Sequence, residues 1–210
     1  MAINKTLRAR DSYVLTYFDR RGRAELSRIL FAISGTVYED RRILFPDWPT
    51  MKPGTPYGHV PFLTVNSVEI GECHAIERFL AREFGLMGST SLEAALIDSA
   101  MEHYVDIFRV YLSAWEKNDA AEMDKLYAET LFKELKPYEK RLVTNGTGYL
   151  VGSELSLADL LVWFLLGDYL DKQRLNPIFA EYPQLQKLVD RVGAIPELKH
   201  HVNTRAITPW

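Results

Sequence analysis

The chain has 210 residues, of which 47% are hydrophobic, 25% charged and 12% aromatic. This composition is typical of an ordinary globular protein and excludes a mainly disordered or collagen-like chain. The formal net charge of −3 leaves no basic excess to neutralise a row of phosphates, so we expect no nucleic acid partner. A single cysteine, Cys73, excludes an internal disulfide, a Cys-x-x-Cys pair and a cysteine-based zinc cage.

The start of the chain carries no recognisable targeting signal. Residues 1–12 are charged and lack the apolar stretch of a signal peptide, and no run of about eighteen apolar residues follows. Together with the lone cysteine, this favours a soluble protein of a reducing compartment. We therefore expect a cytoplasmic location, no membrane partner, and an N-terminal extension over residues 1–12.

Strand and helix patterns alternate in the first third of the chain. Aromatic and β-branched residues indicate strands, and apolar residues at a spacing of three and four indicate helices. The predicted strands span 13–18, 37–43, 61–65 and 68–70, and the predicted helices span 23–34 and 73–84. Four prolines and one glycine between residues 45 and 56 predict a long irregular loop. The order is β-α-β, loop, β-β-α.

The strand pattern vanishes after residue 91. Apolar residues from Ile97 to Trp115 step by three and four, which predicts one long amphipathic helix. Further helices are expected over 124–142, 156–170, 183–193 and 196–205. Ser156 and Asp159 have the spacing of a capping box at a helix start, before an all-apolar stretch, so we interpret them as structural.

Three short segments allow both an ordinary and a functional interpretation. Pro61 after the loop predicts a restrained bend that could leave the Val60 backbone free to pair with a peptide, or a plain strand start. Glu72 and Cys73 at a helix start could hold an anion or form a reactive thiolate, or Cys73 could be buried and inert. Tyr17, at a strand end before several arginines, could fill space or act chemically.

Five motifs together resemble the sigma-class glutathione transferases, the class that includes haematopoietic-type prostaglandin D synthases and S-crystallins. They occur in the family's order, and the similarity runs from about Tyr13 to Pro209. The motifs are Tyr17-Phe-Asp-Arg-Arg-Gly-Arg-Ala-Glu25, Asp47-Trp-Pro49 with Lys52, Val60-Pro61, Glu72-Cys73-His-Ala-Ile76 with Arg78, and Ser156-Leu-Ala-Asp159.

The resemblance implies an α/β, thioredoxin-like domain over residues 13–84, a linker over 85–91 and an all-α domain over 92–210. It also implies a homodimer, glutathione as co-substrate and no metal. An apolar electrophile would bind in a cleft between the two domains.

The resemblance also assigns roles to individual residues. Tyr17 would donate its hydroxyl to the glutathione sulfur, with Arg23 in support. The glutathione-binding positions would be Phe18, Trp48, Lys52, His59, Val60, Pro61, Glu72 and Cys73, together with Asp106, which would reach the ligand of the neighbouring subunit. The co-substrate would contact Arg20, Phe108, Arg109, Tyr111, Leu161, Leu165 and Trp210.

Two of these positions depart from the family's pattern. The family usually has serine at Cys73, and a thiol is a weaker hydrogen-bond donor than a hydroxyl. At His59 the family more often has lysine or glutamine, which reach further. Both differences lead us to expect weaker glutathione binding.

Three functions are consistent with the resemblance. The first is conjugation of glutathione to small hydrophobic electrophiles, as in detoxification. The second is glutathione-dependent isomerisation of a prostaglandin endoperoxide, and the third is an S-crystallin-like structural role with little activity. A thiol-disulfide oxidoreductase would need a cysteine at the start of the first helix, and none lies between Tyr17 and Arg28.

Overall fold

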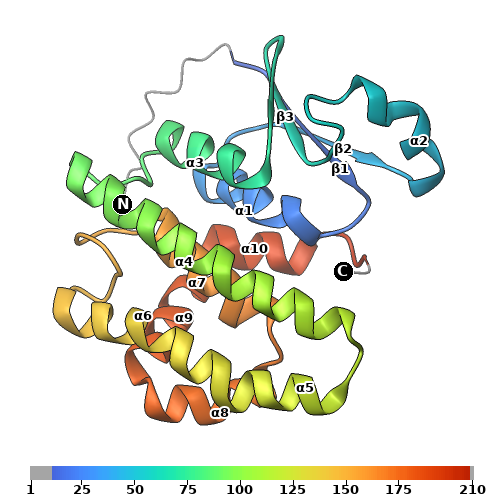
Figure 1. Cartoon of the computed structure of the whole chain (residues 1–210). Helices are drawn as coiled ribbons and strands as arrows, with labels where there is room; N and C mark the ends of the chain where they lie inside the picture. The colour runs from blue at the N-terminus through green and yellow to red at the C-terminus, as the bar shows by residue number, and fades with distance from the viewer. Residues whose placement is uncertain (1–10, 209–210) are drawn as a thin grey trace. The chain divides into compact units, whose positions relative to one another are not determined.

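The computed structural model describes residues 11–208 and divides them into two compact units (Figure 1). The first unit contains the residues up to Leu86 together with those from Pro196 onward, and the second spans Met87–Ile195. The ranges of the two predicted domains stay a prediction.

The first unit is built on a four-stranded mixed sheet with the strand order β2-β1-β3-β4. β1 (Tyr13–Phe18) runs parallel to β2 (Glu39–Ile43) and antiparallel to β3 (Phe62–Val65), which pairs with β4 (Val68–Gly71) in a hairpin. This topology confirms the predicted thioredoxin-like domain.

Three helices complete the first unit. α1 (Glu25–Ser34) contacts both α3 (Cys73–Glu83) and α10 (Pro196–Thr204), and α3 also contacts β3 and β4 (Figure 1). α1 is buried along nearly its whole length because neighbours cover it on several sides. Its predicted end is confirmed at Gly35, whose φ of 67° is the left-handed conformation that glycine adopts without strain.

The proline-rich segment after β2 differs from the predicted irregular loop. It forms three successive short helical turns, η2 (Phe45–Asp47), α2 (Trp48–Met51) and η3 (Lys52–Gly54). A proline lies at the first or second position of each turn, where its missing N–H has no helical partner to lose. The prolines therefore start helical turns here instead of preventing them.

The second unit is entirely helical, as predicted. Its elements are α4 (Ser91–Glu116), α5 (Ala120–Lys125), η4 (Leu126–Thr130), α6 (Leu131–Asn145), α7 (Leu157–Trp163), η5 (Phe164–Tyr169), α8 (Lys172–Glu181) and α9 (Pro183–Gly193). Every residue of α7 is buried, and α7 contacts α4 and α9. α7 is thus the centre of the bundle, as the apolar stretch that begins at Leu160 predicts.

Several helix boundaries differ from the prediction. The helix predicted over 124–142 is α5 and α6 joined by the π-helical η4, and the one predicted over 156–170 is α7 continued by the π-helical η5. α8 was not predicted. The helix predicted over 196–205 is α10, which packs on α1 of the first unit.

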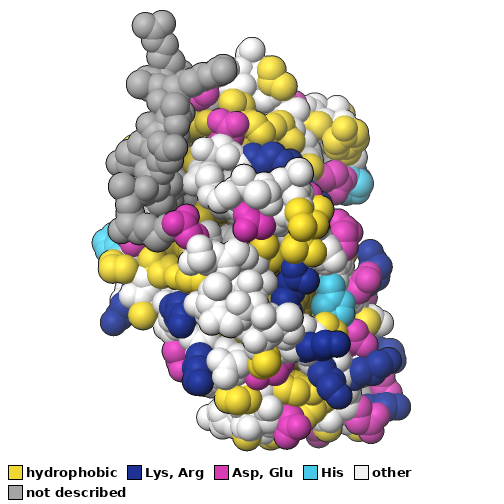
Figure 2. Space-filling model, turned by 90° about the vertical axis from the view of Figure 1, so that its left-hand side faces the viewer, with side chains coloured by type: hydrophobic (Ala, Val, Ile, Leu, Met, Phe, Trp, Pro, Cys, Tyr) yellow, Lys and Arg dark blue, Asp and Glu magenta, His cyan; other side chains and the backbone are white. Residues whose placement is uncertain are grey.

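The surface carries charges of both signs. On the face drawn in Figure 2, basic and acidic side chains lie interspersed, with apolar side chains scattered among them. Among residues 11–208, no helix combines the length and the apolar character needed to cross a bilayer.

Candidate functional site

The register of the sheet brings the predicted glutathione-binding segments to one end of the strands β1, β3 and β4. Thr16 of β1 pairs with Phe62 of β3, and Phe62 pairs with Gly71 of β4. At this end of the strands, Tyr17 and Phe18 come after Thr16, Pro61 and Val60 come before Phe62, and Glu72 and Cys73 come after Gly71. Because adjacent strands lie about 5 Å apart, these three dipeptides lie side by side at this end of the strands.

Tyr17 lies under the turn that joins β1 to α1. Its hydroxyl oxygen accepts a hydrogen bond from the backbone N–H of Arg23 at 3.3 Å. The backbone of Gly22 passes so close that a Cβ there would lie 2.6 Å from the Tyr17 hydroxyl. Since the phenol oxygen accepts this bond, its own proton is free to be donated to a ligand.

An aromatic cluster joins Tyr17 to the short helical turns after β2. The Phe18 ring meets the Tyr17 ring edge-on at 5.6 Å, stacks on Phe45 at 4.4 Å and meets Trp48 at 5.5 Å. The Arg20 guanidinium lies 4.9 Å from the centre of the Phe45 ring. Sequence reasoning named Phe18, Trp48 and Arg20 but missed Phe45, which is 53% exposed.

The Val60-Pro61 peptide bond is cis, so of the two interpretations of this segment the structure has the restrained bend. In the described part of the chain, the Val60 backbone N–H and C=O have no hydrogen-bond partner. Val60 stands just before the ladder of β3 begins, so these two groups are placed to pair with an added extended segment.

Basic side chains lie near this end of the strands. Lys52 is exposed, and its side chain lies 3.8 Å from the position of a Cβ at Gly58, next to the exposed His59. Arg23 is also exposed. These cations provide charge for binding an anionic ligand.

Glu72 and Cys73 start α3. Glu72 has a φ of 66° and an exposed carboxylate that makes no capping hydrogen bond to the helix. The Cys73 thiol is buried, with 8% exposure, and the Cys73 N–H has no acceptor among residues 11–208. An unpaired N–H at the positive end of a helix is suited to hold a carboxylate.

Cys73 also belongs to a small cluster of ligating groups. The Cys73 thiol, the His74 imidazole and the Glu77 carboxylate lie within 4.8 Å of one another, and this donor set could hold a metal such as zinc. Burial opposes the charged form of His74, yet hydrogen bonds to Cys73 and Glu77 raise its pKa to about 10, while burial raises the pKa of Glu77. The positive end of the α3 dipole disfavours a cation at this position.

A buried charge network supports the turn that covers Tyr17. Arg28, with 1% exposure, donates to the backbone oxygens of Arg20 (2.9 Å) and Arg21 (3.2 Å) and to the carboxylates of Glu25 and Asp40. Sequence reasoning missed Arg28, although an arginine inside a helix that is otherwise mostly apolar is a detectable signal. It fixes the turn because it replaces the hydrogen bonds that these carbonyls would make to water.

The predicted residues of the second unit separate into exposed and buried groups. Asp106 and Arg109 are exposed and form an ion pair of 3.1 Å on α4. Phe108 and Tyr111 pack on Tyr169, at ring distances of 4.9 and 5.3 Å. Leu161 and Leu165 are fully buried in the bundle, and Trp210 lies outside the described residues.

The capping box at α7 is confirmed. Both the hydroxyl and the backbone N–H of Ser156 donate to one carboxylate oxygen of Asp159, and the Leu150 N–H donates to the other. Burial raises the pKa of Asp159 to about 6, partly offset by these hydrogen bonds. Since both residues are buried and bonded within the bundle, their role is structural.

Comparisons with known proteins agree with this geometry. Residues 103–205 match the family described as Glutathione S-transferase, C-terminal domain. The chain is 35% identical to Probable glutathione S-transferase 5 of Caenorhabditis elegans, over 95% of this chain and 99% of the relative. It is 36% identical to the hematopoietic prostaglandin D synthase of Gallus gallus, over 94% of this chain and 98% of the relative.

Among solved structures, the monomeric Na-GST-3, a glutathione S-transferase of the hookworm Necator americanus, is 32% identical and superposes with a TM-score of 0.85. The match covers 95% of this chain and 100% of that one. With a thioredoxin-like sheet, a helical second unit and full-length relatives above 30% identity, the chain belongs to the glutathione S-transferase family.

Proposed function

We propose that this glutathione transferase conjugates the glutathione thiolate to small hydrophobic electrophiles, with Tyr17 as the catalytic residue. The observation that carries the proposal is that Tyr17, the unpaired Val60 backbone and the start of α3 lie side by side at one end of the strands. One extended tripeptide with a central thiol and a carboxylate at each end fits this arrangement.

Tyr17 would lower the pKa of the bound thiol by donating its O–H to the sulfur. A thiol with a pKa of about 8.5 is only a few per cent ionised at about pH 7. Lowering that pKa by roughly two units, about 2.7 kcal/mol, increases the thiolate population about 25-fold. The Arg23 N–H polarises the phenol, and the Arg23 cation adds a favourable charge, so an effect of this size is reasonable.

The backbone and side chains at this end of the strands would hold the rest of glutathione. Val60, which lies just before the β3 ladder begins, would pair with the cysteinyl backbone through its unpaired N–H and C=O, as in β-strand addition. Trp48, Lys52 and His59 would hold the glycyl end. The Cys73 N–H and Glu72 would hold the γ-glutamyl end, with Phe18 and Pro61 shaping the floor.

The co-substrate would contact an aromatic surface of the second unit. Phe108, Tyr111 and Tyr169 form one ring cluster, and Arg109 lies next to Phe108 on α4. Arg20 and Trp210 are the further proposed contacts, whereas the fully buried Leu161 and Leu165 would support this surface from within the bundle without touching the co-substrate. Such an apolar surface suits a hydrophobic electrophile.

We assign the chain to the sigma class and propose a cytoplasmic homodimer with a detoxifying role. Asp106 is exposed on α4 and would reach the γ-glutamyl amine bound to the neighbouring subunit. We propose no resident metal, since Tyr17 supplies the chemistry without one.

A second candidate function is glutathione-dependent isomerisation of a prostaglandin endoperoxide. It is supported by the 36% identity to the prostaglandin D synthase of Gallus gallus. An S-crystallin-like structural role is the third alternative, and the retained Tyr17, Trp48, Lys52 and Asp106 argue against it.

The proposal predicts that both the wild type and Tyr17→Phe are retained on immobilised glutathione, but that the variant loses most of its turnover. Loss of one charge-assisted hydrogen bond corresponds to a fall of roughly 10- to 100-fold in kcat with 1-chloro-2,4-dinitrobenzene. Product formation from prostaglandin H2 distinguishes the isomerase. Retention with negligible wild-type turnover would favour the crystallin-like role, and failure to bind glutathione would refute the proposal.

A further inference from the structure

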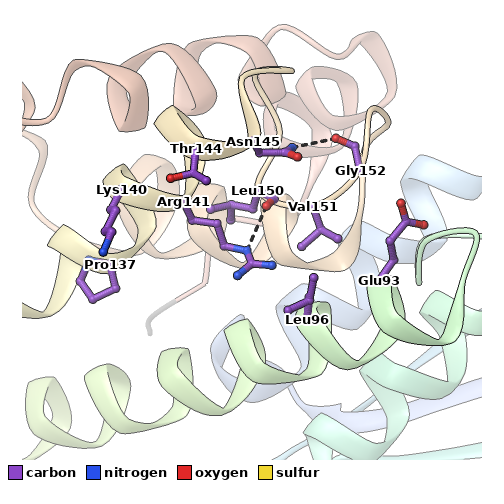
Figure 3. Close-up of a pocket in the computed structure, with 10 residues that line it drawn as sticks. All are labelled: Glu93, Leu96, Pro137, Lys140, Arg141, Thr144, Asn145, Leu150, Val151 and Gly152. Atoms are coloured by element: carbon purple, nitrogen blue, oxygen red, sulfur yellow. Dashed lines mark hydrogen bonds between the residues drawn. The ribbon is translucent and has the colours of Figure 1, made fainter.

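A hollow within the second unit lies far along the chain from the candidate catalytic residues. It has a volume of about 520 Å³, is open to solvent, and is lined by the start of α4, the second half of α6 and the segment 150–152 (Figure 3). Pockets of this size accommodate small organic ligands. No residue assigned above to glutathione or to the co-substrate lines it.

The walls of this hollow are largely apolar. Leu96 of α4 faces it from one side, Pro137 of α6 from the other, and the buried Leu150 and Val151 form its floor (Figure 3). These side chains offer contact to a hydrocarbon or an aromatic ring.

One cation points into the hollow with unused donors. Arg141 donates through Nε to the Leu150 backbone oxygen at 3.1 Å, which fixes the plane of its guanidinium. Its two terminal nitrogens have no acceptor among residues 11–208, and Figure 3 shows them directed toward Leu96. Two parallel N–H donors of this kind match the two oxygens of a carboxylate.

The one acidic residue of the lining does not neutralise Arg141. Glu93 serves the start of α4 instead, because its carboxylate accepts the Ser89 N–H at 2.6 Å while its own N–H donates to Thr90 at 3.1 Å. The amide of Asn145 is occupied as well, since its nitrogen donates to Thr147, Tyr149 and Gly152. The exposed Lys140 adds a second positive charge to the lining.

From this arrangement we infer that the second unit holds a binding site for small amphipathic carboxylates, with Arg141 receiving the carboxylate and Leu96, Leu150 and Val151 receiving the apolar body. The inference is independent of the proposed catalytic role, because no residue is shared.

The test is calorimetric titration of the full-length protein with 4-phenylbutyrate and with its neutral amide. We expect the acid to bind at least about tenfold more tightly than the amide, because only the acid forms the charge-assisted pair with Arg141. In Arg141→Met the acid and the amide should bind with the same affinity. Lys136→Met, which removes an exposed cation from the same helix outside the lining, should keep the wild-type preference.

A second variant tests the same site without changing Arg141, in case Arg141→Met does not fold. Leu96→Trp leaves Arg141 in place but fills the hollow, so neither ligand should bind, while the thermal unfolding midpoint shows that the variant is folded. Equal binding of acid and amide to the wild type, or an unchanged preference in Arg141→Met, would overturn the inference.

Discussion

At the residue scale, Gly22 shows how a missing side chain shapes the candidate catalytic centre. Its φ of 41° is rarely adopted by other residues, and a Cβ would lie 2.6 Å from the Tyr17 hydroxyl. The glycine therefore lets the turn close over the phenol, and the Arg23 N–H reaches the Tyr17 oxygen as a result.

Replacing Gly22 by alanine is expected to reduce catalysis beyond its effect on stability. The new methyl must displace the Tyr17 ring, so kcat should fall roughly 10- to 100-fold, with a smaller change in KM for glutathione. Steady-state kinetics measure kcat and KM, and a spectroscopic titration measures the pKa of the glutathione thiol bound to the variant. In Gly22→Ala this pKa should move back toward its value in free glutathione.

Gly35→Ala is the matched control for Gly22→Ala. Gly35 also has a positive φ, 67°, but a Cβ there would meet no atom within 4 Å. Both substitutions should cost about 1–2 kcal/mol of stability through backbone strain. Only Gly22→Ala should lose activity, and equal kinetic losses in both variants would contradict the role assigned to Gly22.

At the element scale, α10 is fastened to α1 by buried charges. Glu25 of α1 has 1% exposure and accepts hydrogen bonds from His201 and Arg205, each at 2.9 Å, while its second oxygen accepts from Arg28. Burial alone would raise the pKa of Glu25, but His201, Arg28 and Arg205 lower it to about 2. Arg28 in turn holds the turn above Tyr17, so the last helix supports the candidate catalytic turn.

Glu25→Gln is expected to destabilise the protein in a pH-dependent way. Removing one partner of a buried ion pair typically costs about 3–5 kcal/mol near neutral pH. The folded pKa lies below the unfolded value of 4.5, so the stabilisation is complete above that value and is lost as the pH falls through 2. The difference from the wild type should therefore be about 2 kcal/mol smaller near pH 3 than near pH 7.

Urea unfolding at the two pH values measures this difference. Glu39→Gln is the control, because Glu39 forms a 3.0 Å ion pair with Arg41 while its side chain is 57% exposed. Its effect should be small at both pH values, since exposed pairs contribute little. A Glu25→Gln effect that does not vary with pH would contradict the assigned charge network.

The elements that the sequence predicted are those specified by local chemistry. The β1 residues, the Gly35 stop and the Ser156–Asp159 capping box each follow from the residue types at that point. The π-helices η4 and η5, which contain the buried Tyr127 and Phe164, do not, because their apolar spacing continues that of the neighbouring α-helices and carries no local signal for an extra residue per turn. Arg28 was missed for a related reason, since its partners Asp40 and Arg20 come together only in the folded chain.

At the scale of the whole molecule, the proposed homodimer would complete each glutathione site with a residue of the other subunit. Asp106 lies in the second unit, on α4, while every other proposed glutathione contact lies in the first unit. Its side chain is 70% exposed and its partner Arg109 is 74% exposed, so this ion pair contributes little to folding. An exposed carboxylate without a strong structural role is free to bind a ligand's ammonium group.

Mixed dimers test this sharing directly. Asp106→Asn alone should raise KM for glutathione about tenfold with little change in kcat, and Tyr17→Phe alone should lower kcat. Co-expressed with two different affinity tags, the two variants should form a heterodimer in which one site has both Tyr17 and the Asp106 of the other subunit. That site should show the wild-type KM, with about half of the wild-type turnover per dimer, as expected for one intact site of two.

The opposite arrangement gives a different result. If Asp106 served the site of its own subunit, each heterodimer site would lack either Tyr17 or Asp106, and neither would show wild-type kinetics. Sedimentation equilibrium should give twice the chain mass of 24.2 kDa. A monomer mass, or a heterodimer that keeps the raised KM of Asp106→Asn, would contradict the shared site and leave glutathione binding to a single chain.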